Sequence, residues 1–195
     1  RILGELRGQS CIDLEEIQPR KSIMSSKSFG NLLTKKGPIE EALANYAARA
    51  CEKLRKQNSQ AQRVYVFVET NGFREIDRQY NNGFTYTLTT PTSDTRSIRE
   101  AAKFCLSKIY KHGYRYKKTG IMLMDLTSIS LEQKQLFVDL NHCPGDPLMG
   151  IVDRINQDHG PDTLFFGAQG VTREWKMRCG LRSPRYTTQW DELLA

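Results

Sequence analysis

Basic side chains gather in two segments of this chain where they would suit phosphate binding. Eight Lys/Arg and one acid, Glu100, lie between Arg96 and Lys118, and this stretch finishes in Tyr114-Arg115-Tyr116-Lys117-Lys118. Lys27 and Ser28 place an ammonium group and a hydroxyl in a second segment. Such groups bind phosphate oxygens, and these contacts position a duplex without reading its sequence. The candidate DNA-backbone contacts are therefore Lys27, Ser28, Arg63, Arg115, Lys117 and Lys118.

A charge run is often only a solvated helix face, and for Lys103 or Lys108 we prefer that interpretation. It fits residues 115–118 less well, because these charges enter a predicted strand. RNA binding is the main alternative on a sheet of this topology. It requires a strand that presents aromatic rings, and Tyr116-Lys117-Lys118-Thr119-Gly120 does not supply one.

The charge of the chain is unevenly distributed. Residues 1–128 hold 22 Lys/Arg against 13 Asp/Glu, whereas residues 129–195 hold 7 against 9. A basic first part joined to a near-neutral second part predicts one module that meets a polyanion and another that meets something else.

One short motif lies in the polar stretch that joins these parts, Gln133-Lys134-Gln135-Leu136-Phe137. A Gln followed by Leu and Phe at this spacing can fill a polar and an apolar pocket from an extended chain. Exposed Leu136 and Phe137 side chains are unfavourable in a polar linker unless a partner buries them, because burial of each is worth about 1.5–3 kcal/mol. The alternative is a linker that packs back onto its own domain.

Residues suited to catalysis are sparse. Two-metal phosphoryl transfer needs converging carboxylates, but Asp13-Glu15-Glu16 lies in an irregular segment and Asp125 is isolated. Solvated surface carboxylates are the better interpretation. His142-Cys143 has no second ligand pair at zinc spacing, and phosphate cradles and nucleophile–base motifs are absent. We predict no catalytic residue, metal or cofactor in this segment.

Helical periodicity predicts the elements that position the basic residues. Gly37-Pro38 starts a helix that runs from 38 to about 57, with an apolar side made of Ile39, Leu43, Tyr46, Ala47, Ala50 and Leu54. Asp94 is the expected N-cap of a second helix, which carries on one side Ile98, Ala101, Ala102, Cys105, Leu106 and Ile109.

β-branched and aromatic runs predict strands at 63–69, 84–89 and 117–126, and turn signals lie at Asn71-Gly72 and Asn81-Asn82-Gly83. Residues 22–29 are the remaining candidate for an opening strand. The order is β-α-β-β-α-β, an α+β split βαβ sandwich with a four-stranded sheet and both helices on one face. The other face would be free to bind, although topology alone does not name a function.

The part of the chain after 129 follows a different pattern. We expect a linker, then a short helix over 147–158 with one apolar side made of Leu148, Ile151, Val152 and Ile155. Phe165, Phe166 and Trp175 are expected in a core. Residues 173–186 hold five Lys/Arg against one acid and are an alternative place for DNA contacts.

Bulk composition excludes a membrane-spanning protein. Hydrophobic residues make up 38% of the 195 residues, and no apolar run approaches the ~20 residues that a bilayer span needs. Five widely spread cysteines fit reduced cytosolic thiols better than a disulfide framework. The chain starts at Arg1 without an initiator Met and has no signal-peptide pattern, so we expect it to be cut from a longer protein.

Several segments resemble Y-family DNA polymerases of the UmuC type. Residues 27–30, KSFG, and 46–55, YAARACEKLR, resemble the little finger, the DNA-holding domain of these enzymes. Residues 167–170, 175–177 and 181–188, LRSPRYTT, resemble the short C-terminal domain peculiar to UmuC-type proteins, and these C-terminal motifs are the more specific. The resemblance covers nearly the whole chain.

The resemblance implies a catalytic subunit of the DNA polymerase V type, an SOS-induced enzyme that copies across lesions in the bacterial cytoplasm, associated with the nucleoid. Its Mg²⁺-binding carboxylates would lie upstream of Arg1. The implied partners are primer–template DNA, the β sliding clamp through Gln133, Leu136 and Phe137, a UmuD-type dimer and a RecA filament.

The expected organisation has four parts. Residues 1–20 would end the thumb and tether, 21–128 would form the little finger, 129–146 the linker with the clamp motif, and 147–195 the C-terminal domain. Two functional hypotheses follow. In the first, residues 22–128 grip duplex DNA through its backbone; in the second, the segment is chiefly a protein-interaction platform with little DNA affinity of its own.

Overall fold

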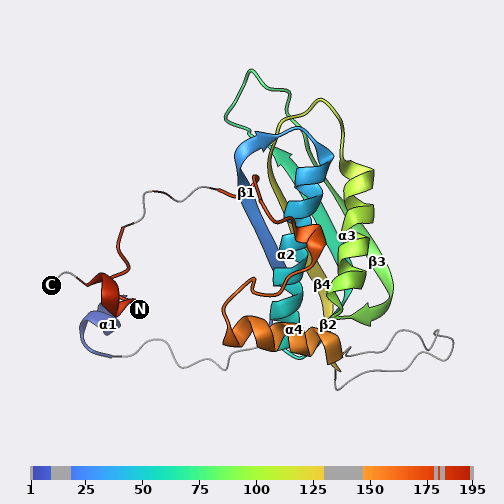
Figure 1. Cartoon of the computed structure of the whole chain (residues 1–195). Coiled ribbons are helices and arrows are strands. Elements are labelled where there is room, and N and C mark those ends of the chain that lie inside the picture. Colours follow the sequence, from blue (N-terminus) through green and yellow to red (C-terminus); the bar gives the residue numbers. More distant parts are fainter. Residues whose placement is uncertain (1, 10–18, 130–146, 178–179, 181–182, 194–195) are drawn as a thin grey trace.

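The computed structural model describes residues 2–9, 19–129, 147–177, 180 and 183–193. Its first part contains α1 (Ile2–Leu6), β1 (Ile23–Leu33), α2 (Lys36–Lys56), β2 (Ser59–Thr70), β3 (Asn81–Thr92), α3 (Thr95–Ile109) and β4 (Tyr116–Ser128). Beyond the linker come α4 (Pro147–Asp158) and two single-turn 3₁₀ helices, η2 (Gly167–Gln169) and η3 (Trp190–Glu192). The predicted β-α-β-β-α-β order is confirmed (Figure 1).

The four strands form one antiparallel sheet in the order β1-β4-β2-β3, so the last strand lies between the first and the second. Helices α2 and α3 lie side by side over one face, as predicted (Figure 1). We call this the helical face and its opposite the open face. The open face is accessible at Met24, Arg63, Thr85 and Thr87.

The apolar sides predicted for the two helices are confirmed. Every predicted position of α2, from Ile39 to Leu54, is buried, and so is every predicted position of α3. The Asp94 carboxylate accepts a hydrogen bond from the Arg96 backbone N–H at 2.9 Å, which makes it the N-cap of α3. These side chains pack against Val64, Val66 and Val68 of β2 and Ile121 and Leu123 of β4.

Two strand predictions need correction. The segment Asn81-Asn82-Gly83, predicted as a turn, forms the first three residues of β3. The opening strand continues past residue 29 to Leu33, with a register shift between Ser28 and Leu33. In both places pairing with a neighbouring strand overrides the local turn preference of Asn and Gly.

Both cysteines of the helical layer are free thiols inside the core. Cys51 lies on α2 and Cys105 on α3, and neither is exposed to solvent. Burial raises the pKa of Cys51 to about 12 and that of Cys105 to about 11. Both are therefore protonated thiols at neutral pH.

The segment after the linker returns to the helical face. Helix α4 has the predicted bounds and lies near the C-terminal end of α2 (Figure 1). Its predicted apolar side is wrong in part, because Leu148 is 44% and Ile151 53% exposed, while Met149 is buried. Contacts with α2 orient the helix instead, through an ion pair between Arg55 and Asp153. Within the described ranges, no helix is long and apolar enough to span a bilayer.

Candidate nucleic-acid interface

The centre of the open face is flattened by glycines. Gly120 on β4 pairs with Ser26 on one side and with Phe67 on the other. A Cβ atom added to Gly120 would lie 2.6 Å from a Phe67 ring atom, so the ring lies over this glycine. A Cβ added to Gly83 on β3 would clash with the ring of Tyr65 in the same way. Two aromatic rings therefore lie close against the sheet.

Tyr65 and Phe67 form a stacked pair, with centroids 6.0 Å apart and ring planes at 25°. They come from β2, two residues apart, so they share a face. Neither ring was among the predicted site residues, because an aromatic strand was considered only at 116–120. The signal was present in the alternation of the run Tyr65-Val66-Phe67, which puts Val66 in the core and both rings on the open face.

Three of the six candidate phosphate contacts lie on this open face. Ser28 pairs with Lys118, which places both beside Gly120. The Lys118 ammonium lies 5.3 Å from the Phe67 ring centroid and 3.6 Å from a carboxylate oxygen of Glu69. Arg63 is ion-paired with Asp125 and remains half exposed. Ion pairs at such exposure are weak, so these cations stay available to a stronger anion.

The other three candidates lie elsewhere. Lys27 pairs with Thr119, whose side chain is fully buried on the helical side, so alternation directs Lys27 to that side of the sheet edge. Lys117 shares this parity, and its ammonium donates to the Phe29 carbonyl at 2.9 Å. Arg115 precedes β4 and lies 3.2 Å from the Asp77 carboxylate.

The tyrosines of the Tyr114-Arg115-Tyr116 run are structural. Together with Tyr80 and Tyr110 they form a cluster of four rings at one end of the sheet. Tyr116 is fully buried, and its hydroxyl donates to the Lys111 carbonyl at 2.9 Å. The Tyr110 hydroxyl donates to the Thr34 carbonyl at 2.7 Å. The tyrosines of this aromatic–basic run therefore stabilise the fold, and only its basic residues remain candidates for binding.

The helical face is covered by residues 162–177, which we call the strap. Trp175 is 4% exposed and packs edge-on against Tyr46 of α2, with ring centroids 5.7 Å apart. Its backbone carbonyl accepts from the Gly30 N–H at 3.1 Å. The prediction that Trp175 is a core residue is thus confirmed, whereas Phe165 and Phe166 are only partly buried.

A charged bridge holds the start of the strap. Asp162 accepts hydrogen bonds from Arg49 of α2 at 3.0 Å and from Arg173 of the strap at 2.6 Å. Burial works against ionisation of this carboxyl, but the Arg173 hydrogen bond and the two guanidinium charges outweigh it and lower the pKa of Asp162. Asn45 adds a buried hydrogen bond to Gln169 at 3.3 Å.

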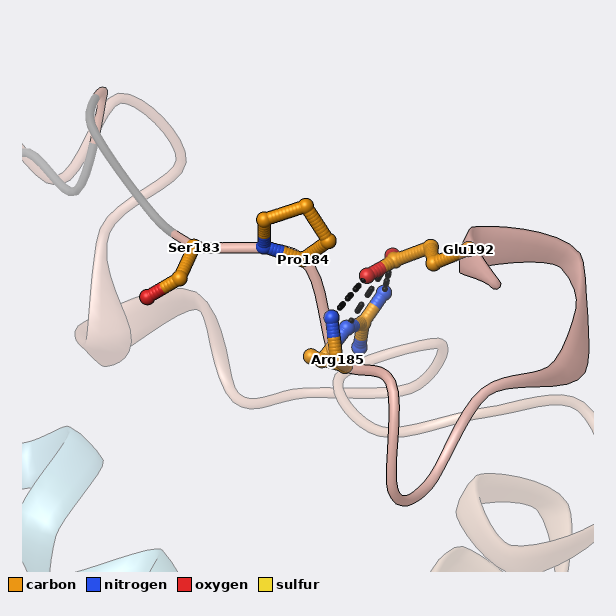
Figure 2. Close-up of a pocket in the computed structure, with 4 residues that line it drawn as sticks. All are labelled: Ser183, Pro184, Arg185 and Glu192. Atoms are coloured by element: carbon orange, nitrogen blue, oxygen red, sulfur yellow. Dashed lines mark hydrogen bonds and ion pairs between the residues drawn. The ribbon is translucent and has the colours of Figure 1, made fainter. Parts of the chain in front are cut away.

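Residues 183–193 form a small loop of their own. Figure 2 shows the Arg185 guanidinium facing the Glu192 carboxylate, at 2.8 Å, beside Ser183 and Pro184. These four residues line an open hollow of about 370 Å³. Trp190 in the same loop is 87% exposed.

Several sequence predictions lie outside the described residues. They are the clamp motif residues Gln133, Leu136 and Phe137, the His142-Cys143 pair and the acidic cluster at 13–16. Among the residues that the structure describes, no group of three or more His, Cys, Asp or Glu is arranged to hold a metal ion.

Family models match both parts of the chain. Residues 20–136 match the impB/mucB/samB family C-terminal domain, and residues 146–195 match a domain of unknown function (DUF4113). Protein UmuC of Salmonella typhimurium is 41% identical over 100% of this chain and 46% of its own length. Protein MucB of Escherichia coli is 38% identical, with 99% of this chain and 46% of the relative covered. The chain thus spans about half the length of these relatives.

Among solved structures, DinB from Sulfolobus solfataricus matches at 10% identity and a TM-score of 0.43 over 53% of this chain and 28% of that one. An insertion ternary complex of Dbh DNA polymerase matches with the same identity and TM-score over 65% of this chain and 34% of that one.

Proposed function

This chain belongs to the impB/mucB/samB family, and on that premise we propose that it is the non-catalytic, DNA-holding and partner-docking part of an SOS-induced, error-prone translesion DNA polymerase. Nucleotidyl transfer and its Mg²⁺ ions are assigned to the rest of the polymerase. The segment holds the duplex by its phosphate backbone on the open face. This proposal includes a location of the whole enzyme in the bacterial cytoplasm, at the nucleoid.

The single observation that supports DNA holding is the flat open face with Ser28, Arg63 and Lys118 around its centre. A duplex is wide, and Gly83 and Gly120 let the rings of Tyr65 and Phe67 lie close against the sheet, which leaves this part of the face low enough to meet it. The aromatic pair does not favour single strands, because base stacking needs an exposed ring. Phe67 is only 6% exposed and lies near the Lys118 ammonium. Duplex backbone contact is therefore the better explanation.

The test compares two pairs of cations on opposite faces. In Arg63→Gln/Lys118→Gln the open face loses two phosphate contacts, so the slope of log K against log salt should become shallower by about 1.8. The control, Lys103→Gln/Lys108→Gln, removes the same charge from α3 on the helical side. It should leave that slope unchanged. Fluorescence anisotropy with a duplex at several salt concentrations measures both.

Equal losses in the two variants would mean that binding reflects only net charge, and the open face would then not be the binding surface. If neither variant binds less well than the unaltered chain, backbone holding by this face is wrong. Different duplex sequences should respond alike, because phosphate contacts carry no sequence information.

Protein docking is the second candidate function, favoured by Gln133, Leu136 and Phe137 in the linker. We assign these residues to the β sliding clamp, and the part after 147 to a UmuD-type dimer or a RecA filament. Leu136→Ala/Phe137→Ala should abolish retention on immobilised clamp while duplex affinity persists. If that variant still binds the clamp, the motif is not the clamp-binding segment. An unaltered chain that binds clamp but no duplex would favour an interaction platform over DNA holding.

A further inference from the structure

The loop between β2 and β3, residues 71–80, presents two large apolar side chains to solvent. Phe73 is 99% exposed and Ile76 96% exposed. Single exposed apolar residues are ordinary on protein surfaces. Here, however, an aromatic and a branched aliphatic side chain project from the same short loop, at the end of the sheet where β4 begins.

The loop is held from inside by one side chain. The Gln79 amide nitrogen shares its two N–H groups among the backbone carbonyls of Asn71, Arg74 and Asp77, at 3.1, 2.8 and 3.0 Å. Its oxygen accepts from the Thr70 hydroxyl at 2.8 Å. The loop therefore has a defined shape, and exposing Phe73 and Ile76 is a consequence of that shape. A contact made by these residues would cost little additional ordering of the chain.

The base of the loop is equally fixed. The Tyr80 hydroxyl donates to the Ile109 carbonyl at 2.7 Å, and its ring lies 4.8 Å from that of Tyr114. Asp77 lies 3.2 Å from Arg115 on the neighbouring segment and 3.2 Å from Arg74. The predicted DNA contact Arg115 thus fixes the loop and compensates the charge of Asp77, which is partly buried.

Basic residues lie in the loop and on the segments at its base. Arg74 and Arg78 belong to the loop. The Lys111 ammonium lies 4.9 Å from the centroid of the Tyr80 ring, and Lys118 lies on the open face near the start of β4. Arg78 is exposed and has no ion-pair partner within the described ranges. Against these cations stand Glu75, which is exposed, and Asp77, which is already paired. The surroundings favour a polyanion.

From these contacts we propose that Phe73 and Ile76 form an apolar wedge that enters a groove of the duplex at a base step, with Arg78 on a flanking phosphate. The inference rests on the proposed DNA-holding function. Proteins that bend DNA insert one or two such side chains between bases. A protein interface would need about 800 Å² from each partner, far more than two side chains provide.

The experiment uses the whole 195-residue chain and a short duplex with 2-aminopurine at successive positions. Phe73→Ala/Ile76→Ala should weaken binding about tenfold while the salt slope stays unchanged, because apolar contacts release no counterions. The unaltered chain should raise 2-aminopurine fluorescence at one step, and the variant should not. Arg78→Gln should instead make the slope shallower by about 0.9.

The matched control is Ile151→Ala/Val171→Ala, which removes two exposed apolar side chains on the helical side and should change neither signal. Equal affinity of the wedge variant and the unaltered chain, or no fluorescence change with the unaltered chain, overturns the wedge and leaves DNA holding intact. Intact duplex affinity with lost retention on immobilised clamp overturns it in favour of a protein contact. An unaltered chain that does not bind duplex overturns both proposals.

Discussion

Glycines allow close approach on both sides of the sheet, but with different results. On the helical side the chain approaches itself closely: a Cβ on Gly30 would lie 2.8 Å from the Lys176 carbonyl, and one on Gly170 would lie 2.6 Å from the Glu41 carboxylate. On the open side Gly83 and Gly120 let two rings lie flat against the sheet. Glycine serves close approach in both cases, but only the first face is closed by the chain's own residues.

This difference separates stability from binding. The helical face is apolar and buries Trp175 with the side chains of α2. The open face carries hydroxyls, cations and an aromatic pair, of which Phe67 is buried and Tyr65 is partly exposed. Substitutions under the strap should therefore change the free energy of unfolding, whereas those at the rim of the open face should change ligand affinity.

The largest effect is expected where the strap meets α2. Trp175→Ala removes a buried indole, and large-to-small substitutions of this kind cost about 3–5 kcal/mol. The free energy of unfolding from urea titration measures the loss. The chain's second tryptophan supplies the control, because Trp190 is 87% exposed and Trp190→Ala should stay within about 0.5 kcal/mol. If both variants lost a similar free energy of unfolding, the strap would not be part of the core.

An intermediate effect is expected at the centre of the open face. In Gly120→Ala the new methyl group meets the Phe67 ring and the Ser26 side chain, and such overpacking costs about 1–3 kcal/mol. The ring would also be lifted from the sheet, so duplex affinity should fall with stability. Gly150→Ala is the control, since nothing lies within 4 Å of that position on α4. There alanine should stabilise the helix by up to about 1 kcal/mol.

The smallest effect concerns the Arg49–Asp162–Arg173 bridge. Because the folded pKa of Asp162 is lowered, its contribution is fully present at neutral pH, begins to fall below the ordinary carboxyl value of about 4, and is lost as the pH falls through the lowered folded pKa. Asp162→Asn should therefore be less stable than the unaltered chain at pH 7 by less than about 1 kcal/mol, since the pair is partly exposed. Chemical denaturation at pH 7 and pH 3 tests this. The difference should be smaller at pH 3 than at pH 7, and an unchanged difference would contradict the electrostatic origin.

Local periodicity was sufficient for the helices. The repeat of apolar residues from Ile39 to Leu54 and from Ile98 to Ile109 predicted which sides of α2 and α3 are buried. Asp94 predicted where α3 begins. These features depend on residues three or four positions apart, so they are readable without knowing the partner surface.

Placement of the candidate site depended on contacts between distant segments. Ser28 and Lys118 share the open face, while the adjacent Lys27 and Lys117 do not, because a strand turns successive side chains to opposite faces. Which residues of a strand lie on the helical face depends on the register with the neighbouring strand and on the helices that pack against that face. A cluster of lysines in the sequence therefore predicted charge, but not which charges meet.

By itself, the sequence determined the order of elements, the buried sides of two helices, the absence of a long apolar run and the segregation of basic charge toward the first part. The tertiary structure alone decided that Tyr65 and Phe67 lie over two glycines, that Arg115 fixes a loop, and that Trp175 completes a core 129 residues after Tyr46. The physical reason is the separation along the sequence of the residues that interact. Periodicity and capping act within a few residues, whereas burial, ion pairing and close backbone approach join segments whose proximity only the folded chain establishes.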